Sequence, residues 1–278
     1  MRRNGAMTLT DRRKQLYTRA CMSSLTKMLL ILDLFSVDKP IWSADEIIQY
    51  CGHSRPTGYR YVKELCDAGL LRRAEGGYSL GPRVIELDYY IRQCDPLLIA
   101  CRPVMVRVAQ ESGCDVLLAS MYGTKIMAVH QELAHETGQI AFGRGRPMPL
   151  FRGGGSKVLL ASMTASQLKK LYDLYGAEIA EAGLGAAWPD FRKQMLKYRN
   201  DGHVVSIGEL DPNAAGVAVP IPVGDALDPA ALVILTTRSR FDLMEKALLV
   251  DMAMNAARQI ETSMRGNREV QAKALLLS

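Results

Sequence analysis

The sequence lacks an apolar run long enough to cross a membrane. Its longest apolar stretches, residues 214 to 222 and 230 to 235, fall far short of the ~20 residues that a bilayer-spanning helix needs. The N-terminus also has no apolar core of the kind that a secretory signal peptide carries. We therefore expect a protein without membrane segments that stays in the cytoplasm.

Paired cysteines and metal-binding motifs are missing as well. The cysteines show no C-x-x-C pair and no regular spacing, which predicts free thiols rather than disulfides or a zinc site. They are Cys21, Cys51, Cys66, Cys94, Cys101 and Cys114. His130 and His135 lack the H-E-x-x-H spacing, and we expect both in a loop at a strand end, which does not support a metal site. No metal and no cofactor is expected.

Charge is unevenly distributed along a chain that is long enough for two domains. The chain has 278 residues, of which 48% are hydrophobic, so two separate cores are possible. Residues 1 to 94 contain 15 Lys or Arg against 10 Asp or Glu, whereas the remainder contains 20 against 19. The basic excess therefore belongs to the N-terminal third, as expected if this part has a nucleic-acid partner.

The first 22 residues have almost no apolar pattern. Six cations lie within the first twenty positions. They are Arg2, Arg3, Arg12, Arg13, Lys14 and Arg19. We expect a flexible basic arm over residues 1 to 22, which either touches phosphates and the minor groove of DNA or makes no specific contact.

Residues 54 to 65 predict a helix with two chemically different faces. One stripe, at spacing i, i+3, i+4 and i+7, consists of Gly58, Tyr61, Val62 and Leu65 and is expected to face a core. The opposite face carries Thr57, Tyr59, Arg60, Lys63 and Glu64. Arginine and lysine donate to phosphates and to guanine, and hydroxyls contact either. We therefore predict DNA contacts from Arg55, Thr57, Tyr59, Arg60 and Lys63.

The upstream segments supply the other two helices of a small DNA-binding unit over residues 23 to 81. Apolar spacing predicts a first helix over residues 24 to 35. Ser43, with Glu46 three residues later, predicts a capping box at the start of a second helix. Gly52 can take the positive φ that the turn into the third helix requires.

A basic hairpin follows the third helix. Residues 69 to 81 predict two short strands around a Glu-Gly-Gly turn. The hairpin would form the wing of a winged helix-turn-helix, with Arg72 and Arg73 near the phosphates. A helical hairpin that merely exposes solvated charges is the alternative, but three helices and a basic hairpin in this order favour DNA binding.

The remaining sequence predicts a linker helix and an α+β domain. The linker helix is expected over residues 82 to 95, and the domain over residues 96 to 278. Periodicity predicts helices at 103 to 112, 156 to 163, 166 to 175, 190 to 200 and 241 to 265. Strands are predicted at 115 to 122, 125 to 131, 140 to 142, 214 to 221 and 230 to 236.

Several separate motifs resemble the isocitrate lyase regulator (IclR) family of bacterial transcription regulators, over about residues 23 to 262. Residues 56 to 65 resemble its recognition helix, 78 to 81 its wing exit, 149 to 161 its glycine-rich loop, and 202 to 221 its Gly-Tyr to Ala-Ala-Pro stretch. The resemblance implies a winged helix-turn-helix domain, a linker helix and a GAF-like antiparallel-sheet effector domain. It also implies a homodimer or homotetramer that binds double-stranded operator DNA, as a repressor or an activator.

An effector site follows from this resemblance. Gly154, Gly155 and Ser156 begin a helix whose free backbone N–H groups suit a carboxylate, although the glycines could instead serve only a tight turn. The implied pocket positions are Ser206, Gly216, Val233 and Leu235. Members that bind small polar acids often carry Asp, Cys, Ser and Ser there, so this pocket should be more apolar and roomier. We expect an aromatic or other bulky carboxylic acid as the effector.

A metabolic enzyme with an accessory helical domain is the alternative function. Ser156 and Lys157 lack the Ser-x-x-Lys spacing of a nucleophile and its base, and no Ser-His-Asp order stands out. The G-x-x-x-x-G-K-[ST] spacing of a nucleotide loop is absent too. Catalysis is therefore not expected. An enzyme would show turnover, whereas a DNA-binding regulator would show DNA affinity that falls steeply with salt.

Overall fold

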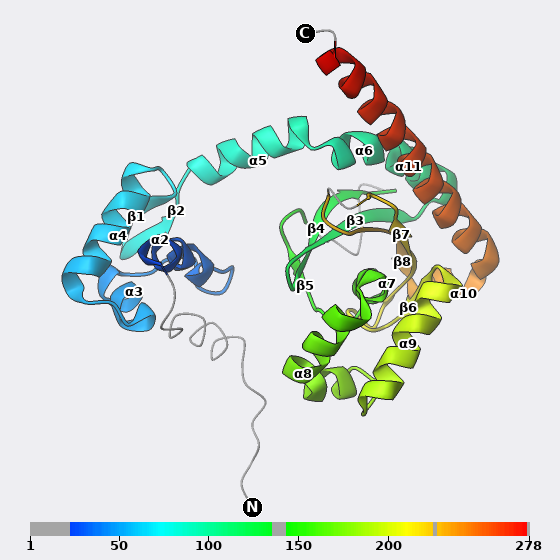
Figure 1. The fold of residues 1–278 in the computed structure, drawn as a ribbon, viewed down its shortest axis with the longest axis horizontal. Helices are drawn as coiled ribbons and strands as arrows, with labels where there is room; N and C mark the ends of the chain where they lie inside the picture. Colours follow the sequence, from blue (N-terminus) through cyan, green and yellow to red (C-terminus); the bar gives the residue numbers. More distant parts are fainter. Residues whose placement is uncertain (1–22, 135–142, 225–226, 277–278) are drawn as a thin grey trace, which may run out of the picture. The chain divides into compact units, whose positions relative to one another are not determined.

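The computed structural model describes residues 23 to 134, 143 to 224 and 227 to 276 (Figure 1). The chain divides between Cys94 and Asp95 into two compact units, and each is described here by itself. The expected basic arm at residues 1 to 22 and the expected strand at 140 to 142 lie outside the described residues.

The N-terminal unit is a winged helix-turn-helix followed by one further helix. Its elements are α2 (Ser24–Leu29), the 3₁₀ helix η1 (Leu30–Leu34), α3 (Ala44–Cys51), α4 (Arg55–Asp67), β1 (Leu71–Ala74), β2 (Gly77–Leu80) and α5 (Arg83–Cys94). The first predicted helix is thus an α-helix that tightens into a 3₁₀ turn. Trp42 extends the antiparallel hairpin by an isolated bridge to β2, because its N–H and C=O pair with the backbone of Tyr78 at 3.0 and 2.8 Å.

The predicted buried stripe of α4 is confirmed. Its buried residues are Gly58, Tyr61, Val62 and Leu65. They pack with apolar residues of η1, α3 and β1, among them Ile31, Leu34, Ile47 and Leu71. A Cβ at Gly58 would lie 2.2 Å from Cγ1 of Ile48, so only glycine lets α3 and α4 approach this closely.

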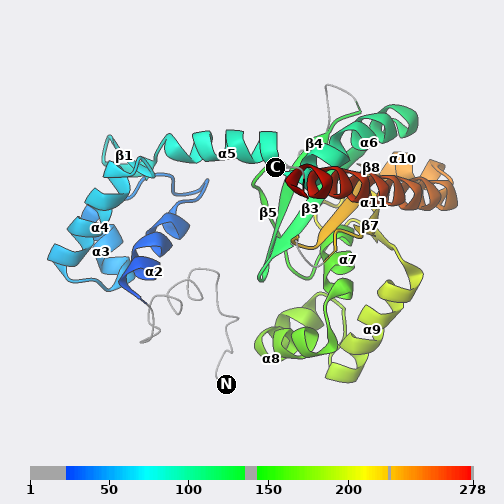
Figure 2. The ribbon, with the colours of Figure 1, turned by 45° about the horizontal axis from the view of Figure 1, so that its top comes forward.

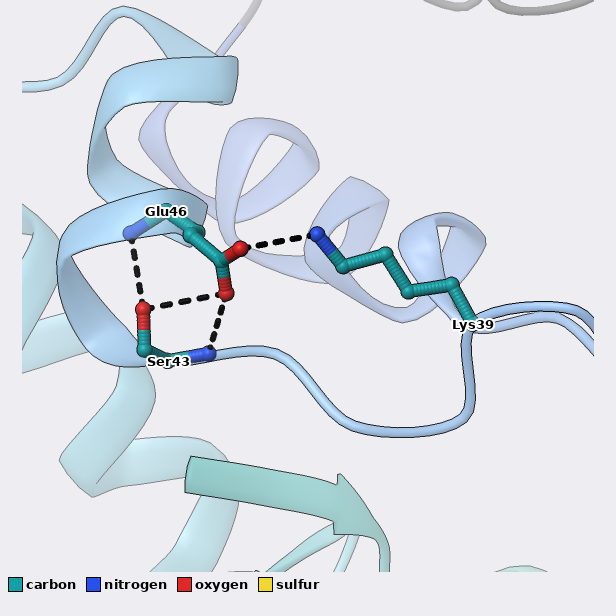
Figure 3. Close-up of polar contacts among 3 residues, drawn as sticks. All are labelled: Lys39, Ser43 and Glu46. Atoms are coloured by element: carbon teal, nitrogen blue, oxygen red, sulfur yellow. Dashed lines mark hydrogen bonds and ion pairs between the residues drawn. The ribbon is translucent and has the colours of Figure 1, made fainter. Parts of the chain in front are cut away.

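The predicted capping box at the start of α3 is also confirmed (Figure 3). The Glu46 backbone N–H donates to Ser43 Oγ at 3.2 Å, and the Ser43 N–H donates to Glu46 Oε2 at 2.9 Å. Lys39 Nζ donates to the other carboxylate oxygen at 2.9 Å. The Ser43 N–H, the Lys39 ammonium and the Ser43 hydroxyl together lower the pKa of Glu46 to about 2. The carboxylate therefore holds the helix start only while it is ionised.

This pKa predicts an acid-dependent stability of the N-terminal unit. The pKa of Glu46 lies below its ordinary value of 4.5, so the stabilisation is present above about pH 4.5 and is lost as the pH falls toward 2. A Glu46→Gln change should therefore weaken the dependence of this unit's unfolding free energy on acid pH. Urea unfolding followed by Trp42 fluorescence in a Trp188→Phe background measures it. An identical acid dependence in both proteins would contradict the prediction.

The C-terminal unit is built on one antiparallel sheet of six strands in the order β5-β4-β3-β8-β7-β6. Its strands are β3 (Asp115–Tyr122), β4 (Lys125–Glu132), β5 (Pro147–Met148), β6 (Val204–Ile207), β7 (Ala214–Ile221) and β8 (Ala230–Thr237). Its helices are α6 (Pro96–Ser112), α7 (Gly154–Ser162), α8 (Ala165–Glu181), α9 (Trp188–Asp201), α10 (Arg238–Leu243) and α11 (Lys246–Leu276). This is the predicted α+β class with a GAF-like sheet.

Helices cover both faces of this sheet. One face, which includes Val116 and Leu118, packs on α6 and α11 (Figure 2). The opposite face, which includes Leu117 and Ala119, packs on α7. Because neighbouring residues of a strand point to opposite faces, burial on both sides explains the continuous apolar runs of β3, β7 and β8. Helices α8 and α9 pack together around a separate apolar cluster that includes Phe191.

The structure corrects several predicted boundaries. The helix expected to begin at Pro103 begins at Pro96, because Asp95 caps it by accepting from the Leu97 N–H at 2.9 Å. The helix expected over 241 to 265 is two helices, separated by the extended backbone of Met244. The helix after the glycines begins at Gly154 rather than at residue 156. Strands β5 and β6 were not predicted, since they are only two and four residues long.

The five described cysteines are free, in agreement with the sequence, and Cys21 lies outside the described residues. Burial raises the pKa of the Cys51 thiol to about 12, and that of Cys101 likewise. Both thiols are therefore protonated near neutral pH and serve as packing groups. Among the helices of the described ranges, none is long and apolar enough to span a bilayer.

Candidate DNA-binding face and effector pocket

The side of α4 opposite its buried stripe is exposed and basic. Arg55, Tyr59, Arg60 and Lys63 are exposed, and Thr57 is half-buried. The Ser54 hydroxyl donates to Thr57 Oγ1 at 2.9 Å, which fixes the threonine hydroxyl near the N-terminus of the helix. Five of the seven side chains predicted to contact DNA thus come from one helix. That helix is the second of the helix-turn-helix pair, the position of a recognition helix.

An acidic residue that the sequence reasoning missed lies on this face. Asp45, in the first turn of α3, accepts a hydrogen bond from the Tyr59 hydroxyl at 3.3 Å and lies 3.6 Å from the Arg55 guanidinium. These groups are exposed, so the ion pair is worth at most about 1 kcal/mol. Asp45 holds two of the predicted DNA-contacting groups near α3. The capping motif at Ser43 predicts the start of α3. No local sequence pattern predicts that α4 passes close to Asp45.

The two arginines of the hairpin lie on opposite faces of it. Arg72 and Arg73 are both exposed, but they are neighbours on β1 and so point to opposite faces of the hairpin. Arg72 Nε donates to Ser79 Oγ, its cross-strand partner, at 3.2 Å. The hairpin therefore presents one guanidinium from each face, and the expected position of both arginines near the phosphates stays a prediction.

A pocket lies in the C-terminal unit between the start of α7 and the sheet face that α7 covers. Its volume is about 480 Å³ when its mouth is included. It is lined by Leu117, Met148, Gly153, Gly154, Gly155, Ser206, Glu209, Leu210, Ala214, Ala215, Gly216, Val233 and Leu235. Six of the seven predicted effector positions are among these residues. Ser156 is not: it is buried, and its hydroxyl donates to the Pro149 carbonyl at 2.7 Å.

The glycines of this pocket allow a close approach of α7 to the sheet. A Cβ at Gly154 would lie 3.0 Å from Cβ of Ala218, and one at Gly155 would lie 3.1 Å from Cγ2 of Val233. Packing alone therefore explains why small residues stand here. The backbone N–H groups of Gly154, Gly155 and Ser156 have no acceptor among the described residues, as expected for the first turn of a helix.

Glu209, a carboxylate of the chain itself, binds the start of α7 at one edge of the pocket. Glu209 Oε2 accepts from the Gly153 N–H at 2.9 Å, and Glu209 Oε1 lies 2.6 Å from Lys157 Nζ. Burial raises the pKa of the Glu209 carboxyl, but the Lys157 ammonium, the Gly153 N–H and the Ser206 hydroxyl outweigh this and bring the pKa below its ordinary value. Glu209 is therefore ionised near neutral pH. The sequence reasoning missed this residue, because 52 positions separate it from its ion-pair partner.

The histidine segment weighed as a metal site is placed differently from the prediction. His130 belongs to strand β4 and not to a loop, and its Nε2 lies 2.6 Å from Glu132 Oε1. His135 lies outside the described residues. Within the three described ranges, no group of three or more His, Cys, Asp and Glu side chains is placed to hold a metal ion.

The chain combines a winged helix-turn-helix, whose exposed helix is basic, with an α+β unit that contains an apolar pocket. This combination is typical of ligand-responsive transcription regulators. The family is identified by a sequence match. Residues 90 to 262 match the model of the bacterial transcriptional regulator IclR C-terminal domain, which is more than half of the chain. The chain therefore belongs to the IclR family of bacterial transcriptional regulators. No curated protein matches it.

Solved structures of the family share the fold. An IclR homolog from Microbacterium hydrocarbonoxydans, solved in complex with 4-hydroxybenzoate, is 23% identical with a TM-score of 0.67, over 88% of this chain and 100% of that one. An IclR family regulator from Brucella abortus is 21% identical with a TM-score of 0.70, over 90% and 93%. The IclR of Thermotoga maritima is 18% identical with a TM-score of 0.60, over 87% and 98%.

Proposed function

We propose that this protein is a sequence-specific DNA-binding regulator whose binding to operator DNA is modulated by a small aromatic carboxylic acid. The observation that carries the proposal is α4, because its buried stripe fixes the helix in its unit while Arg60 and Lys63 stay exposed on the other side. Arginine can bind guanine through two hydrogen bonds, and lysine can neutralise a phosphate. Such a regulator works where the chromosome lies, in the cytoplasm.

The lining of the pocket supports an aromatic ligand. Most of it is apolar, including Leu117, Met148, Val233 and Leu235, and the polar side chains are Ser206 and Glu209. Burying an apolar ring stabilises binding by about 25 cal/mol per Å², whereas a two-carbon acid would leave these side chains without contacts. The relative from Microbacterium hydrocarbonoxydans was solved with 4-hydroxybenzoate, an acid of this kind. The start of α7 supplies free N–H groups for the carboxylate.

We assign DNA binding to residues 23 to 81, linkage to residues 82 to 95, and effector binding and oligomerisation to residues 96 to 278. The linker helix α5 buries none of its side chains, and its apolar residues Val84, Leu87 and Ile91, which share one helical stripe, are exposed. A second copy of the chain would cover these residues in a homodimer or homotetramer. Ligand binding would then change the spacing of two recognition helices relative to half-sites about one helical turn apart.

The DNA contact of α4 is tested by replacing Arg60 with alanine. If Arg60 reads a base, the change should weaken specific binding by about 1 to 3 kcal/mol. Arg192→Ala is the matched control, because Arg192 is an exposed arginine of α9 in the other unit. Fluorescence anisotropy with labelled operator DNA measures both. Equal affinities of the two variants for specific DNA would contradict this role of Arg60.

The enzyme alternative gains no support from the described residues. The two groups that could have formed a nucleophile and a base are engaged elsewhere, since the Ser156 hydroxyl donates to Pro149 and Lys157 is paired with Glu209. The relatives that share the fold are described as transcriptional regulators. A test for turnover is therefore secondary to a test for DNA binding.

A further inference from the structure

We propose that Glu209 sets the charge preference of the pocket. Its carboxylate binds the Gly153 N–H and Lys157 directly beside the free N–H groups of α7, where an effector carboxylate would bind, so that an anionic ligand has to displace it. This inference rests on the proposed function and names the residue that controls which ligands the pocket accepts. At this position the chain supplies an anion of its own.

The contacts of Glu209 are those that a ligand carboxylate would make. One oxygen accepts from a backbone N–H at the start of α7, and the other pairs with the ammonium of Lys157, which also lies on α7. Such charge-assisted bonds from two donors are typical of carboxylate recognition. The Lys157 side chain is only 10% exposed, so within the described residues its charge is compensated by Glu209.

Glu209 stands on a short turn that forms one edge of the pocket. It lies in the turn between β6 and β7, closed by the bond from the Gly208 N–H to the Ala214 carbonyl at 2.8 Å. The next residue, Leu210, covers Gly153, where an added Cβ would lie 2.8 Å from Leu210 Cδ1. The turn therefore carries both a carboxylate and an apolar side chain onto the start of α7, next to the strands that line the rest of the pocket.

This arrangement makes the pocket electrically balanced before a ligand enters. A neutral aromatic molecule can use the apolar lining while Glu209 stays in place. An aromatic carboxylate would meet a like charge close to its own, unless Glu209 leaves Lys157 and Gly153 and the ligand takes over both donors. The same exchange releases the Glu209 side chain from the start of α7, so displacement of Glu209 couples the charge of the ligand to a change in the protein.

Benzoate and benzamide represent the anionic and the neutral aromatic ligand, because they share a ring and differ in charge. The affinities of the full-length protein for both are measured by isothermal titration calorimetry. Glu209→Gln keeps the shape of the side chain and removes the competing charge, so the preference for benzoate over benzamide should rise about tenfold or more. Asp211→Asn is the matched control: it removes a carboxylate from the same turn, where Asp211 Oδ1 accepts from the Asn213 N–H, but Asp211 does not line the pocket. Its preference should equal that of the wild type.

A double change guards against misfolding of the single variant. Glu209→Gln leaves Lys157 as a nearly buried charge without its partner, which lowers stability, whereas Glu209→Gln with Lys157→Gln removes both charges. The preference for benzoate should then fall below that of the wild type, because the cation is gone.

An unchanged or lower preference in Glu209→Gln, with both molecules bound, overturns this inference and leaves the proposed function standing. Benzoate binding only after Glu209→Gln supports the inference. If neither protein binds benzoate, the aromatic acid is wrong as the effector class and the inference falls with it.

Discussion

Replacing Gly58 by leucine is expected to unfold the N-terminal unit and abolish DNA binding, while the C-terminal unit stays folded. Even a Cβ at this position would lie 2.2 Å from Cγ1 and 3.3 Å from Cβ of Ile48, so the clash reaches the stem of that side chain. Overpacking a core usually costs about 1 to 3 kcal/mol and at times more. A unit of this size has little stability to lose. Thermal unfolding followed by Trp42 fluorescence in a Trp188→Phe background reports on this unit.

The matched control is Gly176→Leu in α8. A Cβ at Gly176 would meet only Cζ of Tyr172, at 3.8 Å, so the same exchange of glycine for leucine in a helix is tolerated. Unchanged melting and unchanged DNA affinity of the Gly58→Leu protein would contradict the packing of α3 on α4 described above.

The second large effect is expected in the pocket. Changing Val233 and Leu235 together to serine should weaken the binding of an aromatic acid about tenfold or more, because each buried CH₂ contributes about 0.8 kcal/mol. Binding of a small polar acid such as glyoxylate should hold or improve, since serine hydroxyls add hydrogen-bond partners. Calorimetric titration of both acids measures the change in preference.

Val205→Ser with Ile207→Ser serves as the control for this pair. These residues of β6 flank Ser206, are about one-third exposed, and do not line the pocket. Their replacement should leave the preference between the two acids unchanged. A wild-type protein in which glyoxylate outcompetes every aromatic acid would overturn the assignment of an aromatic effector.

Local pattern was sufficient to predict the buried and exposed faces of α4 and the start of α3. The stripe of α4 follows from helical periodicity, and the capping box at Ser43 and Glu46 follows from two residue types three positions apart. Both depend on neighbours along the chain, and both agree with the structure. The continuation of α6 through Pro103 was missed, because the cap at Asp95 begins the helix two turns earlier.

Contacts between distant segments could not be predicted from the sequence. Four positions of the pocket, Ser206, Gly216, Val233 and Leu235, were named only because the sequence resembles a known family, since no local pattern joins α7 to β6, β7 and β8. Glu209 and Asp45 escaped notice for the same reason. Each is an ordinary acidic residue in the sequence, and its importance comes from a basic partner on another element.

The most direct test of the account is an anisotropy titration of the full-length protein against its own upstream intergenic DNA, at two salt concentrations, with and without aromatic and aliphatic acids. We expect specific binding that weakens steeply at the higher salt, because each phosphate contact releases a counterion. We also expect that an aromatic acid, and not an aliphatic one, changes the affinity. DNA affinity that is equal for specific and unrelated sequences, and that no acid alters, would contradict it.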